Sequence, residues 1–181
     1  MQHYIPQPNG VYPMATNPRQ EHDTIQRLFQ EGVANPDQTI IVTVDIEAYD
    51  AVTNPVRIQA LGLSLRTVDG DESTIRNHYF RIFKNRPFVN RYCPSNPQGF
   101  AHGTTEEIYK AGDLAIRLGV MFWALQRCYR TVVLAGYGTP IDLGFLLHGI
   151  SFLPPMGLVI IDVQLALMHK HGLGLNQKPR L

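Results

Sequence analysis

The chain has 181 residues, 44% of them hydrophobic and 17% charged, and its formal net charge of +1 excludes a protein that attracts nucleic acid by overall charge alone. The chain has two cysteines, Cys93 and Cys128, which are too few for a disulfide scaffold and fit a reducing compartment. They do not have the spacing of zinc ligands. Residues 1–20 lack the pattern of a secretory signal and no apolar run reaches the roughly 18–20 residues that span a bilayer, so we expect a soluble intracellular protein, cytoplasmic or nuclear, without a membrane partner.

The N-terminal segment is rich in proline. Four prolines prevent a regular helix or ladder strand among the first 19 residues: Pro6, Pro8, Pro13 and Pro18. We therefore expect residues 1–20 to form an arm that is either disordered or laid across another surface, such as a protein partner. Residues 21–181 are expected to fold as a single domain, which begins with a helix over residues 21–31 that ends at Gly32.

Three β-strands are expected next. Residues 39–44 form a β-branched, nearly continuous apolar run, which is typical of a central strand buried on both faces. The segments 56–68 and 77–83 indicate a second and a third strand, and the sequence Asp-Gly-Asp at 69–71 predicts a hairpin turn between them. The sheet should therefore begin with a three-stranded meander.

Strands and helices are expected to alternate in the second half of the chain. A long loop over residues 84–103, of a length that is often functional, precedes Thr104 and Glu107, whose spacing predicts a capping box at the start of a helix that reaches Cys128. Further along we expect a strand over 131–136, a helix opened by Pro140, a strand over 157–163 and a last helix that ends near Gly172. This order predicts an α/β fold, a ribonuclease H-like mixed sheet with helices on both faces.

Acidic residues stand where the predicted strands end. Asp45 and Glu47 point to the same face, where two carboxylates repel each other and lose hydration unless a cation lies between them. Mg²⁺ and Mn²⁺ prefer such oxygen ligands. An isolated Asp-x-Glu more often marks a solvated strand end, but Asp142 and Asp162 follow the next two buried strands and would lie near the same edge. The alternatives are a helix-dipole role for Asp142 and an N-cap role for Asp162.

These segments together resemble a known family. IIVTVDIEAYD is similar to the first motif of the histidine-type DEDD 3′–5′ exonuclease superfamily, in which a strand ends in Asp-x-Glu. LAGYGTPIDLGFL resembles its second motif, and IIDVQLALMHKHGL resembles the segment that commonly follows. The resemblance covers about residues 38–175 and is nearest to a fungal exonuclease-like branch, some of whose members are associated with mRNA export and RNA silencing. It implies a ribonuclease H-like fold.

The chain departs from the family pattern in two places. Tyr137, Gly138 and Ile141 stand where the second motif usually has His-Asn and then Phe before its aspartate. The third motif, His-x-x-x-x-Asp on a final helix, is missing, because no histidine is followed by an aspartate five residues later. We therefore expect either a fragment that lacks its last helix or a naturally degenerate domain, and weak or no cleavage by this chain alone.

The resemblance also implies roles for the acids. Asp45 would bridge two metal ions, Glu47 would hold one of them, Asp142 would assist as a ligand, and Asp162 would be a peripheral acid. Two such Mg²⁺ or Mn²⁺ ions stabilise the attacking and the leaving oxygen of a phosphodiester. The missing histidine would be the general base, so the two-ion site is expected to be incomplete.

Basic and aromatic residues alternate between residues 73 and 105. Basic side chains can follow phosphates while aromatic rings stack on bases, so we assign a weak nucleic-acid-binding role to Arg81, Lys84, Arg86 and Arg91. We assign the same weak role to Tyr137, which follows the strand expected over residues 131–136. The alternative is a basic edge strand whose aromatic residues belong to the core.

Two functions remain open from the sequence. The first is a metal-dependent 3′–5′ exonuclease-like domain that acts on single-stranded RNA or DNA, with RNA favoured. The second is a catalytically degenerate nuclease fold that binds RNA or a protein partner. A third and weaker possibility is a domain ordered only within an oligomer, although the sequence does not give the oligomeric state.

Overall fold

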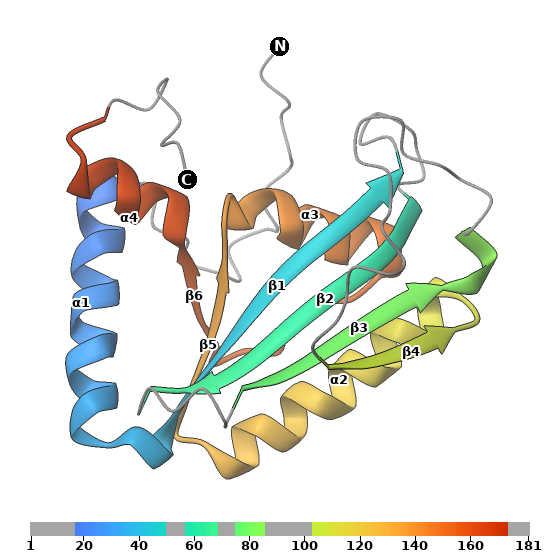
Figure 1. Ribbon diagram of the computed structural model, residues 1–181, viewed down its shortest axis with the longest axis horizontal. Coiled ribbons are helices and arrows are strands. Elements are labelled where there is room, and N and C mark those ends of the chain that lie inside the picture. Colours follow the sequence, from blue (N-terminus) through green and yellow to red (C-terminus); the bar gives the residue numbers. More distant parts are fainter. Residues whose placement is uncertain (1–16, 50–56, 69–74, 86–102, 174–181) are drawn as a thin grey trace.

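A six-stranded mixed sheet forms the centre of the fold (Figure 1). The computed structural model describes residues 17–49, 57–68, 75–85 and 103–173. The strands are β1 (Thr39–Tyr49), β2 (Arg57–Thr67), β3 (Arg76–Ile82), β4 (Thr104–Ile108), β5 (Thr131–Gly136) and β6 (Val159–Asp162). They lie in the order β4-β3-β2-β1-β5-β6; β1 pairs antiparallel with β2 and parallel with β5, and the meander expected from the sequence is confirmed.

Helices cover both faces of the sheet, as expected (Figure 1). They are α1 (Pro18–Ala34), α2 (Ala111–Cys128), α3 (Thr139–Ile150) and α4 (Val163–Lys170), with short 3-10 turns η1 (Pro36–Gln38) and η3 (Phe83–Asn85). Side chains of α2 and α3 fill one face and form the larger hydrophobic cluster. Helices α1 and α4 pack on each other and on β5 and β6, and α1 builds a smaller cluster there on the opposite face. The chain is therefore an α/β protein, and none of its described helices is long and apolar enough to cross a membrane.

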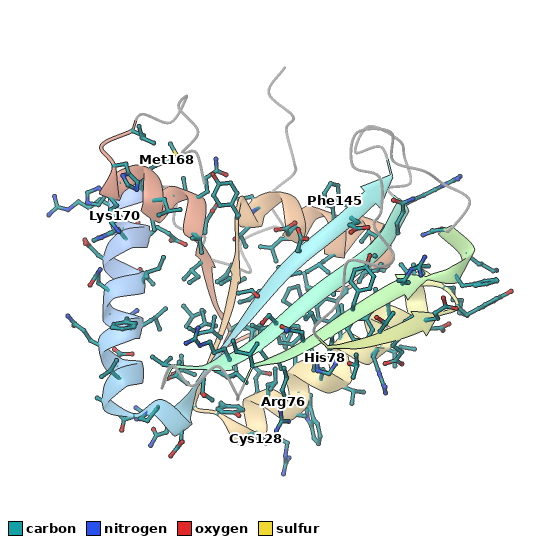
Figure 2. All side chains as sticks on the ribbon, viewed as in Figure 1. Arg76, His78, Cys128, Phe145, Met168 and Lys170 are labelled. Carbon is teal, nitrogen blue, oxygen red and sulfur yellow. The ribbon has the colours of Figure 1, made fainter. Side chains whose placement is uncertain are left out.

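Strand β1 is buried on both faces where it pairs with β5. Ile40, Val42 and Val44 belong to the larger cluster, whereas Ile41 packs against the smaller one. Since side chains alternate along a strand, the odd-numbered residues after Ile41 point to the face of α1 and α4. Figure 2 shows Met168 and Lys170 on α4, beside α1 at the far end of that face, so this helix pair leaves β2, β3 and β4 uncovered.

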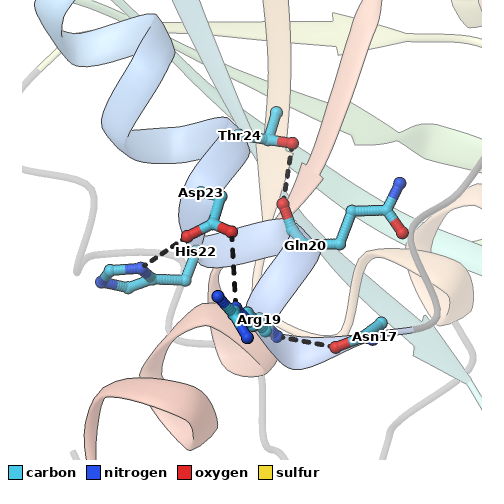
Figure 3. Close-up of polar contacts among 6 residues, drawn as sticks. All are labelled: Asn17, Arg19, Gln20, His22, Asp23 and Thr24. Carbon is cyan, nitrogen blue, oxygen red and sulfur yellow. Dashed lines mark hydrogen bonds and ion pairs between the residues drawn. The ribbon is translucent and has the colours of Figure 1, made fainter.

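Helix α1 begins earlier and ends later than expected. Asn17 is its N-cap, and its side-chain Oδ1 accepts a hydrogen bond from the backbone N–H of Arg19 at 2.9 Å (Figure 3). Pro18 stands at the first helical position, which proline favours. Residues 18–20 therefore belong to α1 and not to the expected arm of residues 1–20. Residues 1–16 of that arm lie outside the described residues. Gly32 is not the C-cap: it lies inside α1, where a Cβ would be 2.6 Å from Cγ2 of Val68, so its role is close packing.

The prediction that a helix begins at Thr104 is wrong. Residues 104–108 form strand β4, which pairs parallel with β3, and α2 begins only at Ala111. The capping-box pattern is outweighed by tertiary pairing, since β-branched residues suit a strand. Thr104 and Glu107 therefore belong to a strand and do not cap a helix, and the carboxylate of Glu106 between them pairs with Arg117 at 3.1 Å. The expected turn at 69–71 and most of the loop at 84–103 lie outside the described residues.

Candidate active site

The carboxyl ends of β1 and β5 lie next to each other at a change in chain direction. From β1 the chain continues to β2 on one side, whereas from β5 it continues through α3 to β6 on the other side. Open α/β sheets bind ligands at such points, outside the carboxyl ends of the strands. Asp45 and Glu47 belong to the end of β1, and Asp142 belongs to the first turn of α3.

Asp45 and Glu47 lie on the open face of β1. Asp45 is exposed, and Glu47 is partly buried. The pairing of β1 with β2 shifts register between Glu47 and Ala48, and such bulges re-aim side chains beside active sites. The Glu47 Oε2 atom is buried without a hydrogen-bond partner. A buried oxygen of this kind is costly unless a proton donor or a cation reaches it.

Tyr79 lies beside this carboxylate pair. From the sequence it was expected only as one of the aromatic residues between residues 73 and 105, with no role at the acids. The strand register places Asp45 opposite Gly62, and Gly62 opposite Tyr79. Because Gly62 has no side chain, the ring of Tyr79 can lie over it, with Cδ2 4.0 Å from where a Cβ would be. The Tyr79 hydroxyl is hydrogen-bonded to Glu47; burial, followed by the charge and hydrogen bond of Glu47, raises the pKa of Tyr79 to about 12. Tyr79 therefore stays a neutral donor that orients Glu47.

Replacing Tyr79 tests this orienting role. Tyr79→Phe keeps the ring over Gly62 and removes only the hydroxyl, so we expect the affinity for Mn²⁺, measured by calorimetric titration, to fall roughly tenfold, as is usual for partners of metal ligands. Thermal unfolding without metal should change little. The matched control is Tyr129→Phe at the end of α2, which should bind Mn²⁺ normally. Unchanged affinity in Tyr79→Phe, or an equal loss in the control, would contradict the role.

Asp142 is held against the end of β5. A Cβ on Gly136 would lie 3.0 Å from Asp142 Oδ2 and 3.0 Å from Thr139 Oγ1, so a side chain at this position would crowd both groups. Gly138, in the left-handed conformation with φ of 75°, turns the chain from β5 into α3. Burial raises the pKa of Asp142 to about 7, and the negative charges of Asp45 and Asp162 add to this. The three carboxyl groups therefore lie within electrostatic reach of one another.

Asp162 takes the role of an N-cap, the alternative considered from the sequence. It is 5% exposed, and its Oδ1 accepts hydrogen bonds from the backbone N–H groups of Gly138 at 3.0 Å and Gln164 at 2.9 Å. Burial raises the pKa of Asp162, although these hydrogen bonds oppose the rise. By binding Gly138 and Gln164 together, Asp162 fixes the start of α3 relative to α4. Its Oδ1 is thus committed to the backbone.

Glu21 is a buried acid that the sequence analysis missed. It lies in the first turn of α1, is 2% exposed, and accepts a hydrogen bond from the backbone N–H of Asp162. Burial raises the pKa of Glu21, and the negative charge of Asp162 raises it further, whereas the hydrogen bond from the Asp162 backbone lowers it. Nothing in the sequence distinguishes Glu21 from a solvent-exposed acid at a helix start, because its burial depends on how α1 packs.

The acids fit a divalent cation in chemistry and only in part in geometry. Glu47 has a buried oxygen without a hydrogen-bond partner, and burial together with the charges of Asp45 and Asp162 raises the pKa of Asp142. A bound cation would favour the charged form of both groups. Within the described ranges, however, no three His, Cys, Asp or Glu side chains converge closely enough to hold a metal ion. The three acids predicted from the sequence, Asp45, Glu47 and Asp142, are therefore spread apart around the strand ends.

Two hollows lie away from these acids. One of about 370 Å³ lies along the outside of α1 and is lined by Asn17, Arg19, Gln20, Asp23, Thr24 and Arg27. The side chains at its rim already contact one another, with Arg19 3.9 Å from Asp23 (Figure 3). The other, of about 450 Å³, lies by the amino ends of β1 and β5, at the opposite end of these strands from Asp45 and Glu47. Neither hollow is part of the candidate site.

The residues expected to bind nucleic acid are only partly brought together. Arg81 is on β3, Lys84 is exposed in η3, and Tyr137 is 40% exposed after β5; Arg86 and Arg91 lie outside the described residues. Tyr109, which follows β4, was not predicted from the sequence. Its ring stacks on Phe83 with centroids 6.1 Å apart, and Lys84 Nζ lies 4.9 Å from its centroid.

No protein-family model matches this chain, and no curated protein matches it. Its function therefore has to be inferred from the chemistry of the site.

Proposed function

We propose that this chain is a metal-dependent 3′–5′ exonuclease-like domain of the histidine-type DEDD superfamily, with a ribonuclease H-like fold, acting on single-stranded nucleic acid, RNA favoured. The observation that carries the proposal is the set of acidic side chains at the carboxyl ends of β1 and β5. Asp45 and Glu47 lie at the end of β1, Asp142 lies in the first turn of α3 after the neighbouring strand β5, and Glu47 Oε2 is buried without a partner. These features favour a divalent cation over a solvated strand end.

Asp45, Glu47 and Asp142 would hold Mg²⁺ or Mn²⁺. Such ions, when bound, polarise the phosphate and lower the pKa of water. The chain's own residues prepare the ligands: Tyr79 orients Glu47, and the hydrogen bond from Gly138 to Asp162 fixes the turn that presents Asp142. Since the pKa of Asp142 is about 7, cation binding near neutral pH would release part of a proton from this group.

The Phe83–Tyr109 pair suits a single-stranded substrate. Both rings are largely exposed, at 48% and 58%, and they follow the carboxyl ends of the parallel strands β3 and β4. Arg81 lies two strands across from Glu47 in the register, at the same end of the sheet. A strand that enters over β4 and β3 would stack bases on the pair, place phosphates near Arg81 and Lys84, and end at the carboxylates.

Removing one ring of the pair tests this substrate path. Tyr109→Ala should weaken binding of a fluorescein-labelled single-stranded RNA roughly tenfold, because one base–aromatic stack contributes about 1–3 kcal/mol. Fluorescence anisotropy in Ca²⁺ buffer measures the affinity. Phe29→Ala on α1, equally exposed at 60%, is the matched control and should bind normally. Equal affinity of Tyr109→Ala and the unchanged chain would exclude the pair as a binding surface.

The decisive experiment for the proposed function combines metal binding and cleavage. Thermal unfolding is followed with and without Mg²⁺ or Mn²⁺, and a 5′-labelled single-stranded RNA is incubated with the protein. We expect a metal-dependent rise in melting temperature. Because the chain has no His-x-x-x-x-Asp motif, we expect cleavage from the 3′ end to be slow or absent. Absence of any metal-dependent stabilisation would refute a metal site at these carboxylates.

A second candidate is an RNA-binding module without catalysis. The observations that favour it are the spread of the acids, the commitment of Asp162 Oδ1 to backbone groups, and the exposed Phe83–Tyr109 pair. This module would bind single-stranded RNA with equal affinity in Mg²⁺ and in chelator, and would leave the RNA intact. Cleavage that is lost on changing Glu47 would count against it.

A further inference from the structure

Helix α2 carries a row of large apolar side chains on its outer face. Ile116, Val120 and Trp123 are 70%, 60% and 60% exposed, whereas Leu114 and Phe122 on the inner face are at most 2% exposed. In Figure 1, α2 runs along the border of the molecule behind β3 and β4, and Figure 2 places Cys128 at its outer end. Single exposed apolar residues are ordinary, but a continuous row on one helix face indicates an interaction site.

The row has the spacing of a helix–helix seam. Ile116, Val120 and Trp123 are separated by four and then three residues, and continuing the same alternation reaches Asp113 on one side and Arg127 on the other. A spacing of three and four keeps residues on one line of contact between two packed helices. The seam therefore has an apolar centre, an acidic end and a basic end.

We propose that this seam binds the same seam of a second copy of this chain, with the two α2 helices antiparallel and a two-fold axis near Val120. Asp113 and Arg127 are each seven residues from Val120, so this axis brings Asp113 of each chain opposite Arg127 of the other. A parallel pair would instead place like charges together at both ends. The charge pattern thus selects a self-complementary, two-fold interface.

The environment of the two charged residues suits this pairing. The side chain of Asp113 is 42% exposed, and Lys110 Nζ lies 3.9 Å from its Oδ1, a loose contact that leaves the carboxylate accessible. The guanidinium of Arg127 lies over the Trp123 ring, 4.9 Å from its centroid, which directs its charge along the seam. Gly112 and Gly119 flank the seam, and no atom lies within 4 Å of where their Cβ atoms would be, so a second helix can approach closely.

Mass measurement in solution tests the interface. By light scattering after size exclusion, the full chain should shift from one to two times 20.4 kDa as its concentration rises. Val120→Glu buries a charge against its own copy on the axis, so this variant should remain a single chain up to about 100 μM. Val33→Glu, at a similarly exposed apolar position on α1, is the matched control and should dimerise normally. A single-chain mass for the unchanged protein at every concentration would overturn the proposal.

Exchanging the two charged residues tests the antiparallel arrangement without altering the apolar residues of the seam. Asp113→Arg and Arg127→Asp should each weaken dimerisation at least about tenfold, because each sets like charges opposite each other. The double variant, with both changes in one chain, should regain the original affinity. A dimer that neither single change weakens, or a double variant weaker than both singles, would show that the chains meet elsewhere or in parallel.

Discussion

Glu47→Gln is expected to abolish the metal-dependent rise in melting temperature, and with it any slow RNA cleavage that the unchanged chain shows. The substitution keeps the shape of the side chain, and its amide can still accept a hydrogen bond from Tyr79, so the packing around it is preserved. What it removes is the negative charge that a cation needs, at the oxygen that is buried without a partner. Since a ligand at 100 times its dissociation constant stabilises a fold by about 2.7 kcal/mol, the lost shift is well above measurement error.

A matched control separates this effect from a general loss of charge. Glu31→Gln removes one acid from the exposed surface of α1, where it pairs with Arg27 at 3.4 Å. An exposed pair of this kind contributes little to stability. The control should therefore keep both the metal-dependent shift and the cleavage rate. If Glu47→Gln keeps them as well, the cation does not bind at the end of β1.

The position of the acid pair follows from the sequence because β1 carries a strong local signal. A β-branched apolar run buried on both faces can hardly be placed elsewhere than in the middle of a sheet, and the acids that follow it must then lie at the strand end. Residues 131–136 are equally apolar and pair with β1 in parallel. The neighbourhood of Asp45 and Asp142 was therefore predictable in outline.

The parts that were not predictable depend on pairing between distant segments. Strand β4 looks like a helix start, and only its parallel pairing with β3 makes it a strand. Tyr79 reaches Glu47 because of the register across Gly62, and a shift of one residue would turn its side chain to the opposite face. Glu21 is buried by the packing of α1 on α4. Local patterns carry no information about any of these three contacts.

Asp142→Asn is expected to stabilise the metal-free protein and to weaken the metal-loaded one. In the metal-free fold, burial and the charges of Asp45 and Asp162 raise the pKa of Asp142 from its ordinary 3.8 to about 7. The folded state then binds a proton more tightly than the unfolded state, so this proton stabilises the fold at low pH, and its contribution is lost as pH rises from about 4 to about 7. Asparagine resembles the protonated acid at every pH. The melting temperature of the variant should therefore exceed that of the unchanged chain by roughly 2–6 °C at pH 8, and by less at pH 5.

Added Mg²⁺ or Mn²⁺ should reverse the order of the two proteins. The cation replaces the proton as the partner of Asp142, so the unchanged chain gains stability at pH 8 that the variant cannot gain in full. Asp37→Asn, at an exposed position in η1, is the control and should change neither curve. A variant that is less stable than the unchanged chain without metal at pH 8 would mean that Asp142 is charged and satisfied in the fold. Because a purely structural acid would not exchange a proton for a cation, the reversal on adding metal distinguishes a ligand from a helix-dipole role.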